Sequence, residues 1–131
     1  MLTIQPAGND LNILMISETN VYNATTMAEE IESWGHGVEI AKTGRESLKK
    51  FRQKQYDLVL VDISMPESRW DKIITQLKEE RPDIGILTMT GSSCPDLEKK
   101  VRQKGILYYL ITPFEIKDLK LILDQWSHKN G

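Results

Sequence analysis

Apolar residues along the chain fall into short runs that alternate with longer amphipathic stretches. The runs cover residues 12–17, 37–41, 57–62, 84–90 and 106–111, and several are apolar almost throughout. A strand that is covered on both faces has this pattern, because neither of its faces meets water. We therefore predict five buried β-strands over these ranges.

Between the runs, apolar residues recur with the 3.6-residue period of an amphipathic helix. The clearest examples are Ala24, Met27, Ala28, Ile31 and Trp34 in the first stretch, and Ile116, Leu119, Leu123 and Trp126 in the last. The three stretches between them show the same period over fewer positions. The chain is therefore predicted to form five helices, one after each strand.

Residues at the expected helix ends support these boundaries. Thr43 and Glu46 have the spacing of a capping box, and Ser93 stands where the fourth helix should begin. Gly35 and Gly105 stand where the first and fourth helices should end, since glycine readily adopts the left-handed conformation that closes a helix. The predicted helix limits therefore rest on capping residues as well as on apolar periodicity.

Five strands that alternate with five helices require right-handed crossovers and a parallel sheet. In open sheets of this class, ligands bind beyond the carboxyl ends of the strands, at a switch point in the strand order. The polar residues at these strand ends are Ser17, Glu18, Asp62, Thr90 and Thr112. We expect the functional site at the edge of the sheet that carries them.

Composition and charge limit the classes of function. The chain has 131 residues, a net charge of −2 and one cysteine, Cys94. These values fit one domain, exclude an internal disulfide, and give no case for nucleic acid or an anionic membrane as the main partner. No apolar run approaches about 18 residues, and residues 1–10 do not resemble a signal peptide. We expect a loose arm over residues 1–10, one domain over residues 11–127, a short tail over residues 128–131, and by elimination a cytoplasmic location.

Glu18, Asp62 and Thr90 come from three different strands but should project from one edge of the sheet. Two carboxylates at such an edge suit a hard cation such as Mg²⁺, which prefers oxygen ligands. An aspartate beside such a cation can act as a nucleophile and form an aspartyl phosphate. The threonine hydroxyl can then form a hydrogen bond to one oxygen of the phosphoryl group.

Three sequence segments together resemble the receiver domain of two-component response regulators. VLVDISMP at residues 59–66 is similar to the family's phosphoacceptor strand and turn, and ILTMTG at residues 86–91 to its fourth strand. GILYYLITPF at residues 105–114 is similar to its fifth strand and the Pro-Phe that follows. The resemblance covers residues 11–127. It implies a flavodoxin-like α/β fold, a doubly wound parallel sheet of five strands in the order 2-1-3-4-5 with five helices.

The resemblance also implies a function and a set of site residues. Asp62 would accept a phosphoryl group from a histidine kinase or a phosphotransfer protein. Glu18, Asp62 and the backbone carbonyl of Ser64 would hold Mg²⁺, with weak affinity. Thr90 and Tyr109 would move together and reshape the surface of the fourth helix, fifth strand and fifth helix. That surface would bind a downstream protein, an output domain or a second copy of the chain.

The chain departs from the family pattern at Ser17, at Thr112 and in the turn after Pro66, where ESRW lacks the glycine often found in the family. Ser17 stands where the family has the first of two acids, which should weaken Mg²⁺ binding. Thr112 stands where the family has a lysine, and threonine cannot supply that charge to a phosphoryl group. Thr112 and Glu115 also have capping-box spacing, so Thr112 could instead begin the last helix, whereas the family has a cis peptide before the following proline.

Aromatic residues near the predicted site carry further expectations. Tyr108 and Tyr109 are neighbours on one strand and must point to opposite faces of the sheet. Trp70, which follows the turn after Asp62, should either cover part of the site or anchor the third helix.

Several functions fit these residues. We prefer a receiver domain that switches on phosphorylation of Asp62 and is not itself an enzyme. Ser17 and Thr112 favour the alternative of a pseudo-receiver, which binds partners without Mg²⁺ or a phosphodonor. A phosphatase of the haloacid-dehalogenase type would need a second acid where Ser64 stands. A flavin carrier would need a glycine- or hydroxyl-rich loop in place of ETNVYN at residues 18–23.

Overall fold

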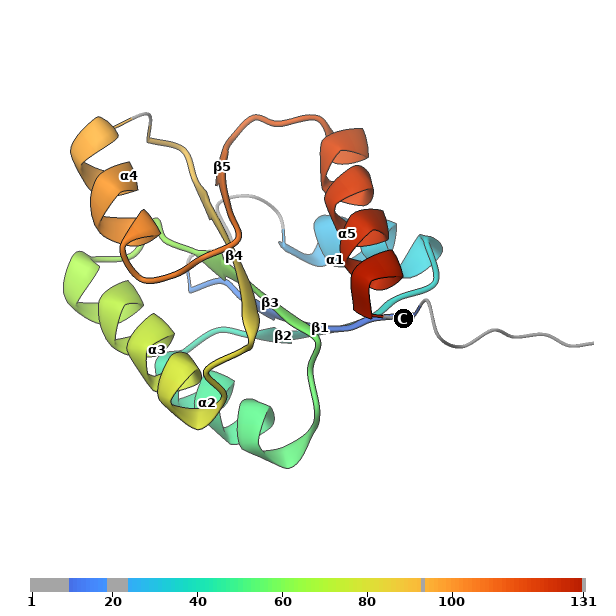
Figure 1. Cartoon of the computed structure of the whole chain (residues 1–131), viewed down its shortest axis with the longest axis horizontal. Helices are drawn as coiled ribbons and strands as arrows, with labels where there is room; N and C mark the ends of the chain where they lie inside the picture. The colour runs from blue at the N-terminus through green and yellow to red at the C-terminus, as the bar shows by residue number, and fades with distance from the viewer. Residues whose placement is uncertain (1–9, 19–23, 93, 131) are drawn as a thin grey trace, which may run out of the picture.

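The computed structural model describes residues 10–18, 24–92 and 94–130. Strands and helices alternate along the whole of this part of the chain (Figure 1). In order they are β1 (Asn12–Ile16), α1 (Ala24–Ser33), β2 (Gly37–Ala41), α2 (Gly44–Gln53), β3 (Leu58–Asp62), α3 (Glu67–Glu80), β4 (Gly85–Thr90), α4 (Pro95–Arg102), β5 (Tyr108–Ile111) and α5 (Ile116–Asn130). The five predicted strands are confirmed, with limits that differ by at most two residues.

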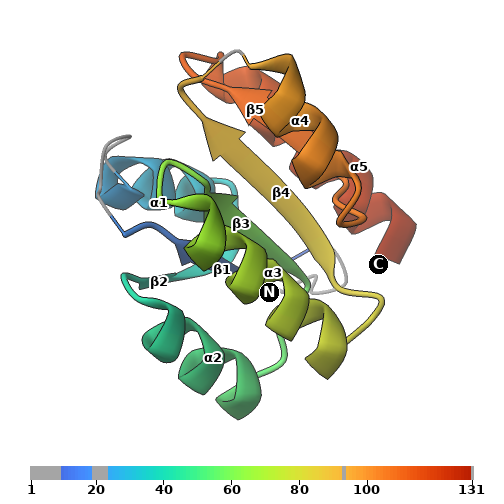
Figure 2. The ribbon, with the colours of Figure 1, turned by 90° about the vertical axis from the view of Figure 1, so that its left-hand side faces the viewer.

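The strands form one parallel sheet in the order β2-β1-β3-β4-β5. Helices α1 and α5 cover one face, while α2, α3 and α4 cover the other (Figures 1 and 2). This is the flavodoxin-like fold that the family resemblance implied, with the 2-1-3-4-5 strand order. The order reverses where β1 and β3 lie side by side, which makes the carboxyl ends of these two strands the expected ligand site.

The sheet separates two apolar clusters, because successive residues of a strand point to opposite faces. Leu14, Val59 and Ile86 pack with α2, α3 and α4. Met15 and Leu60 pack with α1 and α5 on the other side. Strands β3 and β4 are buried at every position. This rigid centre holds the strand ends in place.

The start of α2 is capped as the sequence predicted. The Thr43 hydroxyl accepts a hydrogen bond from the Glu46 N–H at 3.0 Å, and the Glu46 carboxylate accepts one from the Lys42 N–H at 2.7 Å. For α4, the predicted cap Ser93 lies outside the described residues. The N-cap position is occupied by Cys94, which makes no capping hydrogen bond with its side chain.

The ends of other helices also follow the sequence pattern. Gly35 and Gly105 have φ angles of 99° and 82°, in the left-handed region that glycine tolerates best. Helix α5 runs to Asn130, past the predicted domain boundary at residue 127. Among the described residues, no helix has the length and apolar character that crossing a membrane requires.

Candidate functional site

Asp62 is the last residue of β3, and the residue is only 1% exposed. One carboxylate oxygen accepts the backbone N–H of Ser64 at 2.9 Å, and the other accepts the hydroxyl of Ser17 at 3.3 Å. Ser17 directly follows β1, the neighbouring strand. The fold therefore places a buried carboxylate at the switch point of the sheet and orients it through two neutral donors.

Thr90 ends β4, beside Asp62 on the next strand, since Asp62 lies opposite Met89 in the strand register. The Thr90 hydroxyl accepts the backbone N–H of Ser92 at 3.1 Å. A hydroxyl has one proton and two lone pairs, so this hydrogen bond leaves the Thr90 proton able to donate to a further acceptor. The structure thus brings the predicted nucleophile and the predicted hydroxyl donor to neighbouring strand ends.

Thr112 links β5 to β4. Its backbone N–H and its hydroxyl both donate to the carbonyl oxygen of Thr90, at 2.8 and 3.3 Å. The interpretation of Thr112 as the start of the last helix is wrong, because α5 begins at Ile116 and the hydroxyl is used in the bond to Thr90. The Thr112–Pro113 peptide is cis, as the family resemblance implied.

Glu18 follows Ser17 at the same edge and forms an ion pair with Arg69, in the first turn of α3. The Arg69 Nη2 atom lies 2.6 Å from the Glu18 carboxylate. Sequence reasoning missed Arg69, although a basic residue so soon after the turn that follows Asp62 could have been recognised as a neighbour of the acidic edge. The positive charge of Arg69 therefore lies on Glu18, which the family resemblance assigns to metal binding.

The donors at this edge are of the type that Mg²⁺ takes. By the family resemblance, Asp62 and Glu18 would supply carboxylates and Ser64 would supply its backbone carbonyl. Within the described ranges, no group of three or more acidic, histidine or cysteine side chains could hold a metal ion. Mg²⁺ commonly binds through one or two carboxylates and keeps several waters, so this donor set fits it, with Glu18 engaged by Arg69.

The aromatic residues divide between the two faces of the sheet. Tyr109 is half-buried against the α2–α3–α4 cluster, beside the Arg102 guanidinium, and burial raises the pKa of its hydroxyl. Tyr108 is 42% exposed on the α5 side and donates to Gln125 at 3.4 Å, so the two side chains point to opposite faces as predicted. Trp70 is buried in the same cluster as Tyr109 and anchors α3.

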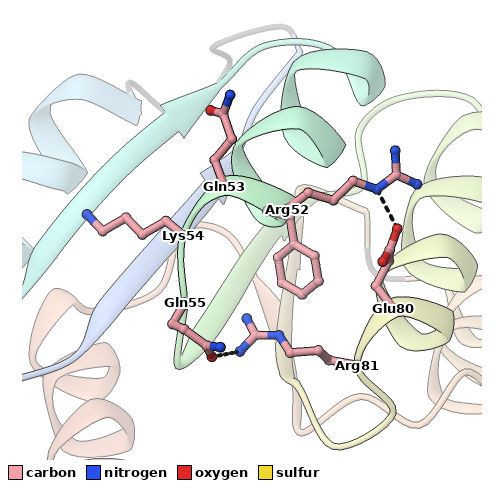
Figure 3. Close-up of a pocket in the computed structure, with 7 residues that line it drawn as sticks. Arg52, Gln53, Lys54, Gln55, Glu80 and Arg81 are labelled. Carbon is pink, nitrogen blue, oxygen red and sulfur yellow. Dashed lines mark hydrogen bonds and ion pairs between the residues drawn. The ribbon is translucent and has the colours of Figure 1, made fainter.

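A cavity of about 320 Å³ lies near the amino end of β3, whereas Asp62 stands at the carboxyl end of that strand (Figure 3). It is lined by the end of α2, the segment that leads into β3, and the end of α3. Two of its cations already have partners, since Arg52 pairs with Glu80 and Arg81 donates to Gln55 at 2.8 Å. These contacts join α2, α3 and the loop before β3, and the cavity is separate from the edge that carries Asp62.

Comparison with known proteins finds relatives and solved structures with this fold. The family model for the response regulator receiver domain matches residues 6–124. The transcriptional regulatory protein ZraR of Klebsiella oxytoca is 32% identical over 119 residues, which cover 91% of this chain and 27% of that protein. The chain therefore spans about a quarter of the length of this relative.

Solved structures show the same fold. The response regulator TrrA of Thermotoga maritima, in complex with Mg²⁺-BeF, superposes with a TM-score of 0.76 at 24% identity and covers 88% of this chain and 98% of its own. The beryllofluoride-activated NtrC4 receiver domain dimer gives a TM-score of 0.80 at 23% identity and covers 92% of this chain and 98% of its own. At these identities the likeness establishes the fold.

Proposed function

The chain belongs to the response regulator receiver domain family of two-component systems, and from that premise we propose that it accepts a phosphoryl group on Asp62. The observation that carries the proposal is the Asp62 carboxylate itself, buried at the switch point and oriented by Ser17 and Ser64. A nucleophile held in one orientation has already lost the freedom that in-line attack would otherwise cost. The domain acts as a phosphoacceptor in signalling and not as an enzyme.

The transfer is a displacement at phosphorus. One Asp62 carboxylate oxygen forms a bond to the phosphorus of a phosphohistidine, the P–N bond breaks, and its electron pair stays on the imidazole nitrogen of the donor. A histidine kinase or a phosphotransfer protein supplies that phosphohistidine. The Thr90 hydroxyl, at the neighbouring strand end, donates to one oxygen of the new aspartyl phosphate.

A bound Mg²⁺ would neutralise part of the charge on the transferred group. Asp62, Glu18 and the backbone carbonyl of Ser64 are the groups that would hold it. Neutral Ser17 leaves this edge with one acid fewer than the family pattern, so the affinity for Mg²⁺ is weak. TrrA, which has the same fold, was solved in complex with Mg²⁺-BeF, and this supports the proposal.

The proposed output surface is formed by α4, β5 and α5. Large apolar side chains are exposed on β5, on α5 and just before β5; they are Leu107, Tyr108, Ile111, Ile116 and Leu121. Exposed apolar groups of this kind favour a protein partner. We propose a downstream protein or output domain as that partner, or a second copy of the chain, as in the NtrC4 receiver dimer. The proposed location is the cytoplasm, without direct contact to nucleic acid.

A pseudo-receiver is the second candidate function. Two contacts favour it: Thr112 binds the Thr90 carbonyl where a lysine would supply charge, and Arg69 already neutralises Glu18. A domain of this kind would bind its partner equally well without Mg²⁺ or a phosphodonor. A partner that binds only the phosphorylated chain would exclude it.

Intact-mass spectrometry after incubation with Mg²⁺ and acetyl phosphate tests the proposed function. We expect the wild-type chain to gain one phosphoryl group and Asp62→Asn to gain none, because the amide is a poor nucleophile. A known receiver labelled in parallel serves as the positive control. If the folded wild-type chain gains nothing, or if Asp62→Asn gains as much as wild type, the proposal is wrong.

A further inference from the structure

The Glu18–Arg69 ion pair joins the segment after β1 to the first turn of α3. The atoms are 2.6 Å apart, and the Glu18 and Arg69 side chains are 28% and 53% exposed. The contact is therefore within reach of solvent, and ions can exchange at it. It engages the carboxylate of Glu18, which directly follows Ser17, the residue whose hydroxyl donates to Asp62.

At this edge of the sheet, Asp62 has neutral hydrogen-bond donors, whereas Glu18 has a cationic partner. Asp62 is buried and receives only neutral donors, the Ser17 hydroxyl and the Ser64 N–H. Thr112 contributes a hydroxyl without charge. Arg69 thus brings a positive charge to this edge, and it pairs with a carboxylate that is partly open to solvent.

We propose that Arg69 is a built-in counter-cation that competes with a divalent cation for Glu18. The proposal rests on the proposed function of the site and deepens it, because it names a device that regulates access of the metal. The guanidinium engages one of the two Glu18 carboxylate oxygens at 2.6 Å, and its positive charge lowers the affinity of that carboxylate for a metal ion. The metal-free state is therefore stabilised by the chain itself.

Arg69 has a position to occupy once it leaves Glu18. It lines a groove of about 400 Å³ between α2 and α3, together with Gly44, Arg45, Leu48, Lys72, Ile73 and Gln76. The displaced guanidinium can remain there in contact with water. We expect the exchange to proceed by rotation of the Arg69 side chain.

The test is the affinity for Mn²⁺, used as a spectroscopic substitute for Mg²⁺ and measured by the loss of the free Mn²⁺ signal in electron paramagnetic resonance. We expect Arg69→Gln to bind Mn²⁺ about threefold more tightly than wild type, or more, which is the size of effect that a partly exposed ion pair can supply. Glu18→Gln should bind Mn²⁺ more weakly. Circular dichroism checks that each variant is folded.

Two controls separate competition for Glu18 from a general change of charge. Lys72→Gln removes one positive charge from the same helix and the same groove, and should change the Mn²⁺ affinity less than Arg69→Gln does. In the Glu18→Gln background, Arg69→Gln should give no further tightening, because the shared carboxylate is gone. Equal affinities of Arg69→Gln and wild type, an equal effect of Lys72→Gln, or tightening that persists without Glu18 would each overturn the proposal.

The result is independent of phosphoryl transfer. If acetyl phosphate fails to label Asp62 but Arg69→Gln tightens Mn²⁺ binding, the proposed function fails and the competition stands. If Asp62 is labelled but Arg69→Gln leaves the Mn²⁺ affinity unchanged, the proposed function stands and the competition fails.

Discussion

At the scale of single residues, the site combines a buried carboxylate with neutral donors. Ser17 and Ser64 orient Asp62 through hydrogen bonds, and Thr112 binds the Thr90 carbonyl. None of these contacts adds positive charge. An aspartyl phosphate formed here would carry more negative charge than the carboxylate it replaces, so the residue at position 112 should control how far the reaction proceeds.

We predict that Thr112→Lys raises the fraction of Asp62 that is phosphorylated at a fixed, subsaturating acetyl phosphate concentration. A charged hydrogen bond contributes roughly 1.5–3 kcal/mol, which corresponds to about a tenfold or larger change in an equilibrium. Intact-mass spectrometry gives the phosphorylated fraction. Thr112→Met is the matched control, because it loses the same hydroxyl and adds no charge. Equal labelling of Thr112→Lys and Thr112→Met would show that charge at this position has no effect.

The sequence predicted the positions of the candidate site residues in the fold better than it predicted their contacts. The positions of Asp62 and Thr90 at strand ends followed from the apolar runs that precede them. Arg69 was missed because its contact with Glu18 joins residues 51 positions apart, and no local pattern encodes such a pair. Thr112 was open to two interpretations because capping spacing is local, whereas its actual acceptor lies on β4.

At the scale of elements, the close approach of β4 to its neighbours depends on Gly85. A Cβ atom at this position would lie 2.6 Å from a Leu58 methyl, 2.8 Å from a Leu107 methyl and 3.0 Å from the Trp126 ring. Glycine at the start of β4 therefore lets β3, β5 and α5 converge. Apolar periodicity located β4 in the sequence, but this convergence could not be predicted, since it involves three segments that are distant along the chain.

We predict that Gly85→Ala lowers the free energy of unfolding by about 1–3 kcal/mol, the usual cost of adding a methyl group to a packed core. Urea denaturation measures this free energy. Gly44→Ala is the control, because its Cβ would lie 3.4 Å from Ile73 at ordinary contact distance, at the start of a helix. That variant should be as stable as wild type or about 0.4–1 kcal/mol more stable. Equal stability of the two variants would contradict the packing argument.

At the scale of the whole molecule, His36 connects pH to stability. Its side chain is 7% exposed, and its Nδ1 atom accepts the backbone N–H of Leu11 at 3.0 Å. Burial lowers the pKa of His36 from its usual 6.5, against the opposing effects of Asp10 and Asp124. A protonated imidazole could not accept the Leu11 hydrogen bond, so the folded state favours the neutral form.

We predict that the folded protein loses stability as the pH falls below about 6.5, because the unfolded chain then binds a proton more readily at His36 than the folded chain does. The loss levels off below the lowered pKa of the folded state. Urea denaturation at pH 7.5 and pH 5.5 measures it. His36→Asn keeps an acceptor for Leu11 and does not titrate, so its stability should fall less over this range. An equal fall in both proteins would exclude His36 as the cause.

The burial of the sheet differs from its centre to the edge formed by β5. Every residue of β3 and β4 is buried, whereas Tyr108 and Ile111 of β5 are exposed. In mechanical terms, we expect the sheet to be more rigid at β3, which carries Asp62, than at β5. Local opening costs least where few apolar groups are buried. We therefore expect a small disturbance at Thr90 to pass through the bond to Thr112 and to move β5 more than it moves β3.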